Sequence, residues 1–114
     1  MKTIEQINAE LIQFCHVHFK IPVDVLKNDP SFDEMNLDSL TKLEILFHAD
    51  EAHGSNVLDY LEDGLIDGNP PSRLSELAKL IPKCLIPVKE FLLERKIAAT
   101  QQSLISVQSH SNEI

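Results

Sequence analysis

Few side chains in this sequence combine the types and the spacing that catalysis or metal binding requires. His16 and His18 are two residues apart in a helical stretch, and residues with that spacing do not face each other on a helix. His48 and His53 are five apart, whereas two metal ligands that share a helix face are typically four apart. The histidines therefore do not indicate a metal site.

Other reactive groups are equally sparse. Residues 59–67 hold three aspartates and a glycine, but they lack the D-x-D-x-D-G pattern and the final glutamate of a calcium loop. The sequence has no glycine-rich phosphate loop and no patch of basic and aromatic residues. We therefore predict that the chain is not an enzyme. The feature that remains is the run Asp38-Ser39-Leu40.

The surrounding elements place this serine at the start of a helix. Asp38 suits the N-cap of a helix over 38–53, and Gly54 suits its left-handed end. The expected apolar face of this helix comprises Leu40, Leu43, Leu46, Phe47 and Ala49. Residues 21–37 are rich in proline and asparagine and predict a long loop. Its apolar residues are expected to pin it to the core, namely Val23, Val25, Leu26, Phe32 and Met35.

Helical patterns also occur on both sides of this segment. Residues 3–20 predict an amphipathic helix with Thr3 as its N-cap, ended by Pro22. Residues 57–66 predict a short apolar element, followed by a break at 68–71. A further helix is expected from Ser72 to the proline at position 82, with an N-terminal capping arrangement of Ser72, Ser75 and Glu76. Pro87 suits the start of one more helix.

The composition fits one helical domain in a reducing compartment. The chain has 114 residues, 43% of them hydrophobic, with only three glycines and no tryptophan. No apolar stretch approaches a membrane span, and the N-terminus lacks the apolar core of a signal peptide. We therefore expect a cytoplasmic protein in which Cys15 and Cys84 are free thiols.

Negative charge is concentrated in the part of the sequence that contains Ser39. Residues 33–67 contain ten acidic residues and one basic residue, and this segment therefore carries a charge of −9 in a chain whose net charge is −8. Such a surface repels nucleic acid and attracts basic protein surfaces. We therefore expect protein partners and no nucleic-acid partner.

The order of these features resembles the acyl carrier protein family over about residues 3–81. The shared features are a long loop with Ser31-Phe32, the Asp38-Ser39-Leu40 run, Leu40-Thr41-Lys42-Leu43-Glu44 after it, acids at Asp50-Glu51 and a turn at Gly54. The resemblance implies an all-α, acyl-carrier-like four-helix bundle with an additional C-terminal helix. We expect the domain over 1–82, a helical extension over 83–108 and a disordered tail over 109–114.

The resemblance also implies a covalent modification of Ser39 and a role in carrying acyl groups. A phosphopantetheinyl transferase would move 4'-phosphopantetheine from coenzyme A to Ser39, and Asp38 would contact that enzyme and its magnesium ion. The arm would then hold acyl intermediates as thioesters for fatty-acid, polyketide or related biosynthesis. Acyl-transferring or condensing enzymes with basic patches would dock on Asp38, Glu44, Phe47, Asp50 and Glu51. The acyl group would slip between helices, against Leu43, Leu46, Val57, Leu61 and Leu77.

Some parts of the sequence depart from the family pattern. Met35-Asn36-Leu37 precedes Asp38 where the family usually has a Gly-Ala pair, and residues 59–72 are longer and more broken than usual. Residues 83–114 have no counterpart in a compact carrier and could support a homodimer, with Phe91 and Leu92 packing on the bundle or on a second copy.

Two alternative functions stay open. The chain could be an unmodified carrier-like fold that acts as a protein-interaction module, or a carrier of aminoacyl or peptidyl groups.

Overall fold

The computed structural model describes residues 2–95, which are helical and contain no strand. The prediction of an all-α fold is therefore confirmed for this part of the chain. The elements are α1 (Ile4–Phe19), α2 (Val23–Lys27), α3 (Ser39–His53), α4 (Val57–Glu62), α5 (Leu74–Leu80) and the 3-10 helix η1 (Ile81–Cys84), and residues 88–95 are again helical. The predicted tail over 109–114 and the part of the extension over 96–108 lie outside the described residues.

Local signals set the ends of α1 as predicted. The Thr3 hydroxyl accepts the backbone N–H of Gln6 at 3.1 Å, while the Gln6 side chain accepts the N–H of Thr3 at 2.9 Å. This reciprocal pair satisfies two of the amides that a helix start leaves free. Lys20 ends the helix in the left-handed conformation, two residues before Pro22. The helix buries one stripe, formed by Ile7, Leu11 and Cys15.

The segment predicted as a loop over 21–37 contains the short helix α2. Pro22 stands at its N-cap, where the missing N–H of proline leaves no donor unsatisfied. Leu26 and Phe32 are buried, as expected for residues that pin the segment to the core. Val25 is 41% exposed, so its assignment as a pinning residue was wrong. One helical turn leaves it on the solvent side of α2 while Leu26 packs inward.

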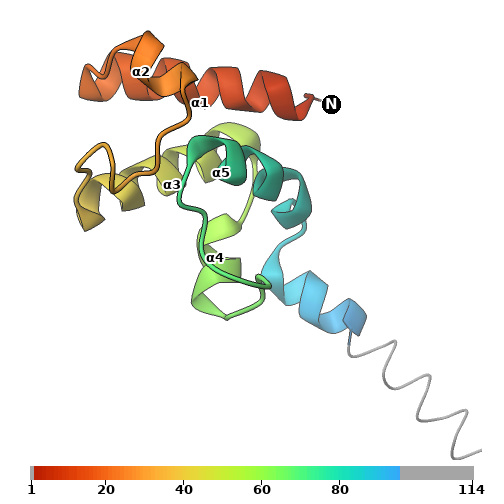
Figure 1. Cartoon of the computed structure of the whole chain (residues 1–114). Coiled ribbons are helices and arrows are strands. Elements are labelled where there is room, and N and C mark those ends of the chain that lie inside the picture. The colour runs from red at the N-terminus through yellow and green to blue at the C-terminus, as the bar shows by residue number, and fades with distance from the viewer. Residues whose placement is uncertain (1, 96–114) are drawn as a thin grey trace, which may run out of the picture.

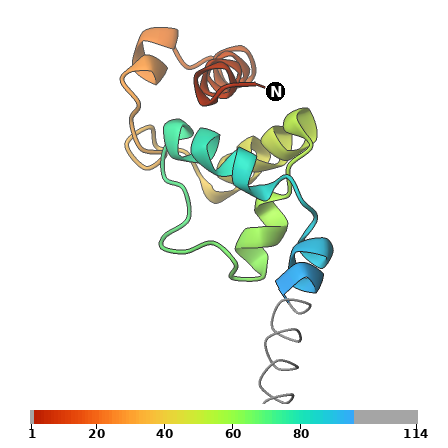
Figure 2. The ribbon, with the colours of Figure 1, turned by 90° about the vertical axis from the view of Figure 1, so that its right-hand side faces the viewer.

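The helices of the described residues lie at three levels. Figure 1 shows α1 and α2 at one end, α3 and α5 in the middle, and α4 with the helical residues 88–95 at the other end. In Figure 2, α1 is seen almost along its axis while α5 is seen from the side, so the two helices cross. The most extensive packing between elements joins α1 to α5. Every level contributes to the core, which includes Leu11, Leu26, Ile45, Val57, Leu77 and Ile81.

Helix α3 turns a different face to the core than the sequence pattern suggested. Ile45 and Ala49 are fully buried, whereas three of the five residues assigned to the apolar face are exposed. These three are Leu40 at 64%, Leu43 at 48% and Phe47 at 64% exposure. Apolar residues occur on several sides of this helix, so their spacing alone could not identify the buried side. That part of the prediction was wrong.

The chain after the break at 68–71 also differs in detail from the prediction. Helix α5 begins at Leu74 rather than Ser72, although the backbone N–H and hydroxyl of Ser72 both donate to the Glu76 carboxylate, at 2.8 and 3.0 Å. The α-helix ends at Leu80, two residues before Pro82, as predicted, and the chain continues as the 3-10 helix η1, whose first turn tolerates proline. The predicted start at Ser72 was two residues early.

Residues beyond η1 pack on α4. Val88 is buried, and the Phe91 ring lies 5.3 Å from that of Tyr60 between ring centroids. The Tyr60 hydroxyl donates to the Ile86 carbonyl at 2.7 Å. Phe91 therefore packs on α4, while Leu92 is 44% exposed.

Candidate functional site

Ser39 is the first residue of α3, at the junction of a loop and a 15-residue helix. Asp38 caps the helix, since its carboxylate accepts the backbone N–H of Thr41 at 2.7 Å. This hydrogen bond lowers the pKa of the Asp38 carboxyl, and the group is therefore anionic at neutral pH. Asp38 and Ser39 are both exposed. The predicted acceptor hydroxyl is therefore open to a macromolecular partner.

The same helix carries an exposed apolar and acidic surface that starts beside Ser39. With about 3.6 residues per turn, positions 40, 43, 44, 47 and 51 fall on one side of a helix. All five are exposed, which distinguishes them from the buried Ile45 and Ala49 on the opposite side. We call this surface the outer face of α3, formed by Leu40, Leu43, Glu44, Phe47 and Glu51.

A groove continues the outer face towards α4. It has a volume of about 380 Å³, and its walls include Phe47, Glu51, Leu58 and Asp59. The groove is therefore lined by both apolar side chains and carboxylates. Three predicted docking residues, Glu44, Phe47 and Glu51, thus lie on one continuous surface, and the sequence prediction had not placed Leu40 and Leu43 there.

Asp50, a fourth predicted docking residue, is half-buried and lines the same groove, where it accepts hydrogen bonds from the protein itself. Its carboxylate accepts the Ser55 hydroxyl at 2.6 Å and the backbone N–H groups of Val57 and Leu58 at 2.8 and 3.0 Å. These bonds satisfy the first amides of α4, whose own N-cap residue, Asn56, makes no side-chain cap. Asp50 therefore fixes the α3–α4 junction through both of its carboxylate oxygens.

The five residues predicted to line an acyl pocket lie at three different depths. Val57 and Leu77 are fully buried in the core, Leu46 and Leu61 are half-buried, and Leu43 belongs to the outer face. The structure thus separates Leu43 from the other four. A cavity of about 250 Å³ lies instead at the far end of α3, with walls that include Lys2, Ile7, His53, Ile81 and Leu85.

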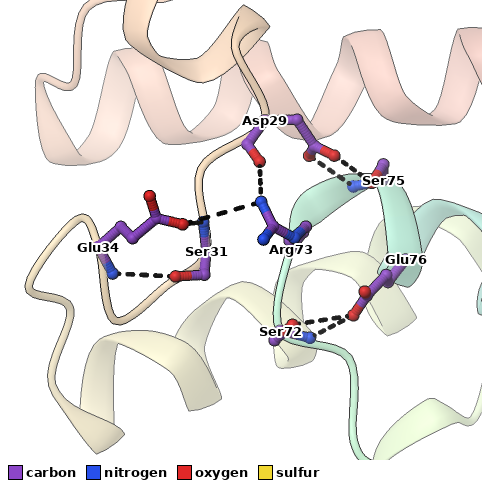
Figure 3. Close-up of polar contacts among 7 residues, drawn as sticks. All are labelled: Asp29, Ser31, Glu34, Ser72, Arg73, Ser75 and Glu76. Carbon is purple, nitrogen blue, oxygen red and sulfur yellow. Dashed lines mark hydrogen bonds and ion pairs between the residues drawn. The ribbon is translucent and has the colours of Figure 1, made fainter.

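Polar contacts join the loop before α3 to the start of α5 (Figure 3). The Asp29 carboxylate accepts the hydroxyl and the backbone N–H of Ser75, at 2.5 and 3.3 Å. The Arg73 guanidinium donates to the Asp29 carbonyl at 2.6 Å. We call these contacts the loop clasp, formed by Asp29, Arg73 and Ser75. No local sequence pattern indicates the loop clasp, because Asp29 is 44 residues from Arg73 and 46 from Ser75.

A smaller local feature supports the loop. Ser31 and Glu34 cap a helical turn reciprocally, with the Ser31 N–H donating to Glu34 and the Glu34 N–H to the Ser31 hydroxyl, both at 3.0 Å. The S-x-x-E spacing is a known capping signal and could have been recognised in the sequence. These bonds lower the pKa of the Glu34 carboxyl.

The remaining reactive side chains are used in packing. The His48 ring stacks on Phe14 with 3.6 Å between ring centroids, which joins α3 to α1. Cys15 and Cys84 are free, as predicted. Both are buried, and burial raises the pKa of each thiol to about 11. Such thiols are poor nucleophiles at neutral pH. Within residues 2–95, no group of three or more histidine, cysteine, aspartate or glutamate side chains is placed to hold a metal ion.

Neither a membrane-spanning helix in the described part of the chain nor a similar known protein indicates a function for this chain. Over the described residues, no helix combines the length and the apolar character needed to span a membrane. No protein-family model, curated protein or solved structure matches the chain. Its function is therefore inferred from its own side chains and their geometry.

Proposed function

We propose that this protein is a cytoplasmic acyl carrier that holds its cargo on a 4'-phosphopantetheine arm attached to Ser39. The observation that carries the proposal is the position of Ser39. It is an exposed serine at the N-terminus of a long helix, preceded by an anionic aspartate and adjoining the outer face of α3. The carrier catalyses nothing itself, and its partner enzymes perform the chemistry.

The start of α3 suits the product of the modification. Attachment of the arm converts the hydroxyl into an anionic phosphodiester. The first amides of a helix point towards such a group, and the positive end of the helix dipole stabilises negative charge there. Asp38 takes the Thr41 amide, so the preceding amides of Ser39 and Leu40 remain at the end of the helix for the phosphodiester.

The outer face of α3 suits partner enzymes with basic patches around an apolar pocket. Leu40, Leu43 and Phe47 offer contact area, and Glu44 and Glu51 flank them with negative charge. Complementary charge mainly speeds association and weakens as salt is added. The transferase and the acyl-transferring or condensing enzymes would use this surface in turn. Dimerisation through residues 83–108 stays a prediction. In the described part of this range, the exposed large apolar side chains are Leu85, Ile86, Leu92 and Leu93.

Intact-mass measurement tests the modification. The folded chain is incubated with coenzyme A, magnesium and a broad-specificity phosphopantetheinyl transferase. We expect one phosphopantetheine on the wild type and on the control Ser72→Ala, and none on Ser39→Ala. Asp38→Asn should keep the helix cap, since asparagine caps as well as aspartate, but should slow the modification at least ~10-fold by removing the charge.

The outer face of α3 also favours a second candidate function. An unmodified interaction module would use the same exposed leucines, phenylalanine and glutamates without any arm. A folded wild-type chain that takes no adduct from several transferases would support that function and contradict the carrier proposal. Loading of the modified chain with fatty acyl, aminoacyl or peptidyl groups would then distinguish the classes of cargo.

A further inference from the structure

The loop before Ser39 is bounded by two residues in an unusual backbone conformation. Asp29 and Asn36 have φ angles of 54° and 57° and are not glycines. The left-handed region is costly for most residues and is tolerated best by asparagine and aspartate. Residues 30–35 therefore run between two points at which the backbone needs support from surrounding contacts.

Contacts with α5 supply that support at one end. The loop clasp ties Asp29 to Arg73 and Ser75 (Figure 3), and the Phe32 N–H donates to the Ser72 carbonyl at 2.8 Å. Arg73 also lies 3.8 Å from a Glu34 oxygen, close enough for an ion pair. The charged Arg73 thus reaches the loop at two places.

An ion pair with α3 and a hydrogen bond within the loop supply support at the other end. The Lys42 ammonium pairs with the Asp33 carboxylate at 2.7 Å, and the Leu37 N–H donates to the Phe32 carbonyl at 3.1 Å. Phe32 itself is 4% exposed and packs in the core. The loop is therefore held between α5 and α3, and Asp38-Ser39 follows directly from it.

We propose that Arg73 and Asp29 are positioning residues for Ser39, because they hold the loop in the one conformation that presents Asp38-Ser39 to the modifying enzyme. This role rests on the proposed carrier function. Neither residue touches the acceptor hydroxyl. When the loop clasp opens, the loop samples other conformations, and the apparent affinity of the enzyme falls with the fraction of chains still in the competent one.

Transferase kinetics on the full chain test this role. We expect Arg73→Ala to raise the KM for the carrier about tenfold with kcat unchanged, as the loss of a charge-assisted hydrogen bond would give. Arg73→Lys should restore most of the affinity, because lysine can still donate to the Asp29 carbonyl. Lys79→Ala is the matched control, since Lys79 is an exposed basic residue of the same helix. Amide hydrogen exchange over residues 30–38 should quicken in Arg73→Ala and not in Lys79→Ala.

A second variant, Asp29→Asn, keeps the test valid if Arg73→Ala does not fold. Asp29→Asn keeps a residue that tolerates the left-handed backbone but weakens the acceptor for Ser75, and it should shift KM and exchange in the same direction. If KM and exchange in both variants match Lys79→Ala while the wild type is modified, the positioning role is overturned and the carrier function stands. If the wild type takes no adduct, the carrier function itself fails, and the positioning role fails with it.

Discussion

At the scale of single residues, neighbours of the same chemical type have different roles. Asp50 and Glu51 are adjacent acids in α3, and the sequence suggested docking for both. The Asp50 oxygens accept three hydrogen bonds at the start of α4, while Glu51 is exposed on the outer face of α3. A hydrogen-bonded, half-buried carboxylate contributes to stability, whereas an exposed one is available to a partner.

Truncation of the two acids should separate these roles. We expect Asp50→Ala to lower the free energy of unfolding by about 2 kcal/mol, because it leaves the Val57 and Leu58 amides and the buried Ser55 hydroxyl without their acceptor. Glu51→Ala should change it by less than about 0.5 kcal/mol. Denaturant unfolding followed by circular dichroism measures both. Equal stabilities of the two variants would show that the Asp50 cap does not form.

At the scale of elements, α3 is the helix that sequence patterning described least well. Its apolar residues lie on more than one side, and the core selects the side that carries Ile45 and Ala49. The outer face of α3 consequently keeps two leucines and a phenylalanine in contact with water. Exposed apolar side chains that share one helix face are typical of a surface used by partners.

A pair of aliphatic truncations in α3 tests this assignment. Ile45→Ala should cost about 3 kcal/mol of unfolding free energy, because it removes a fully buried side chain and leaves a cavity. Leu43→Ala, two residues earlier and half-exposed, should cost less than about 1 kcal/mol. Thermal or denaturant unfolding of both variants supplies the comparison. A larger loss of unfolding free energy in Leu43→Ala than in Ile45→Ala would mean that the face of α3 carrying Leu43 is the buried one.

At the scale of the whole molecule, histidines lie where α3 meets α1. His48 stacks on Phe14, and the charged or titratable groups around it are His18 from α1 with Glu51 and His53 from α3. The nearly buried His53 ring faces Glu10 at 3.4 Å, with Lys2 nearby. Burial lowers the pKa of both His48 and His53 below the ordinary 6.5.

The sign of the resulting pH dependence follows from proton binding. The unfolded chain takes up protons on His48 and His53 near pH 6.5, before the folded chain does. Stability from these groups is therefore complete above pH 6.5 and is lost as the pH falls through their lowered pKa values. We expect the free energy of unfolding to decline below about pH 6.5.

The double variant His48→Gln/His53→Gln is the control for this pH dependence. Its stability should stay level until nearer pH 4.5, where carboxyls whose pKa is lowered by hydrogen bonds, such as Glu34 and Glu76, begin to protonate in the unfolded chain. Denaturant unfolding at a series of pH values measures both proteins. Identical pH profiles would contradict a role for the two histidines.

The sequence determined those features that depend on residues only a few positions apart. Thr3 and Asp38 begin their helices, Gly54 ends α3 in the left-handed conformation, and the placement of Ser39 at a helix start follows from its neighbour. Caps and helix ends need partners within about four residues, and the chain order supplies these directly.

Only the tertiary structure decided the features that depend on distant partners. Packing of α3 against the core put Ile45 inside and Phe47 outside, because burial depends on what the other helices present rather than on spacing alone. The loop clasp joins Asp29 to Arg73 and Ser75 across more than forty residues, and no local pattern encodes such a pairing. The candidate serine was thus visible in the sequence, whereas the surface beside it and the contacts that hold its loop required the fold.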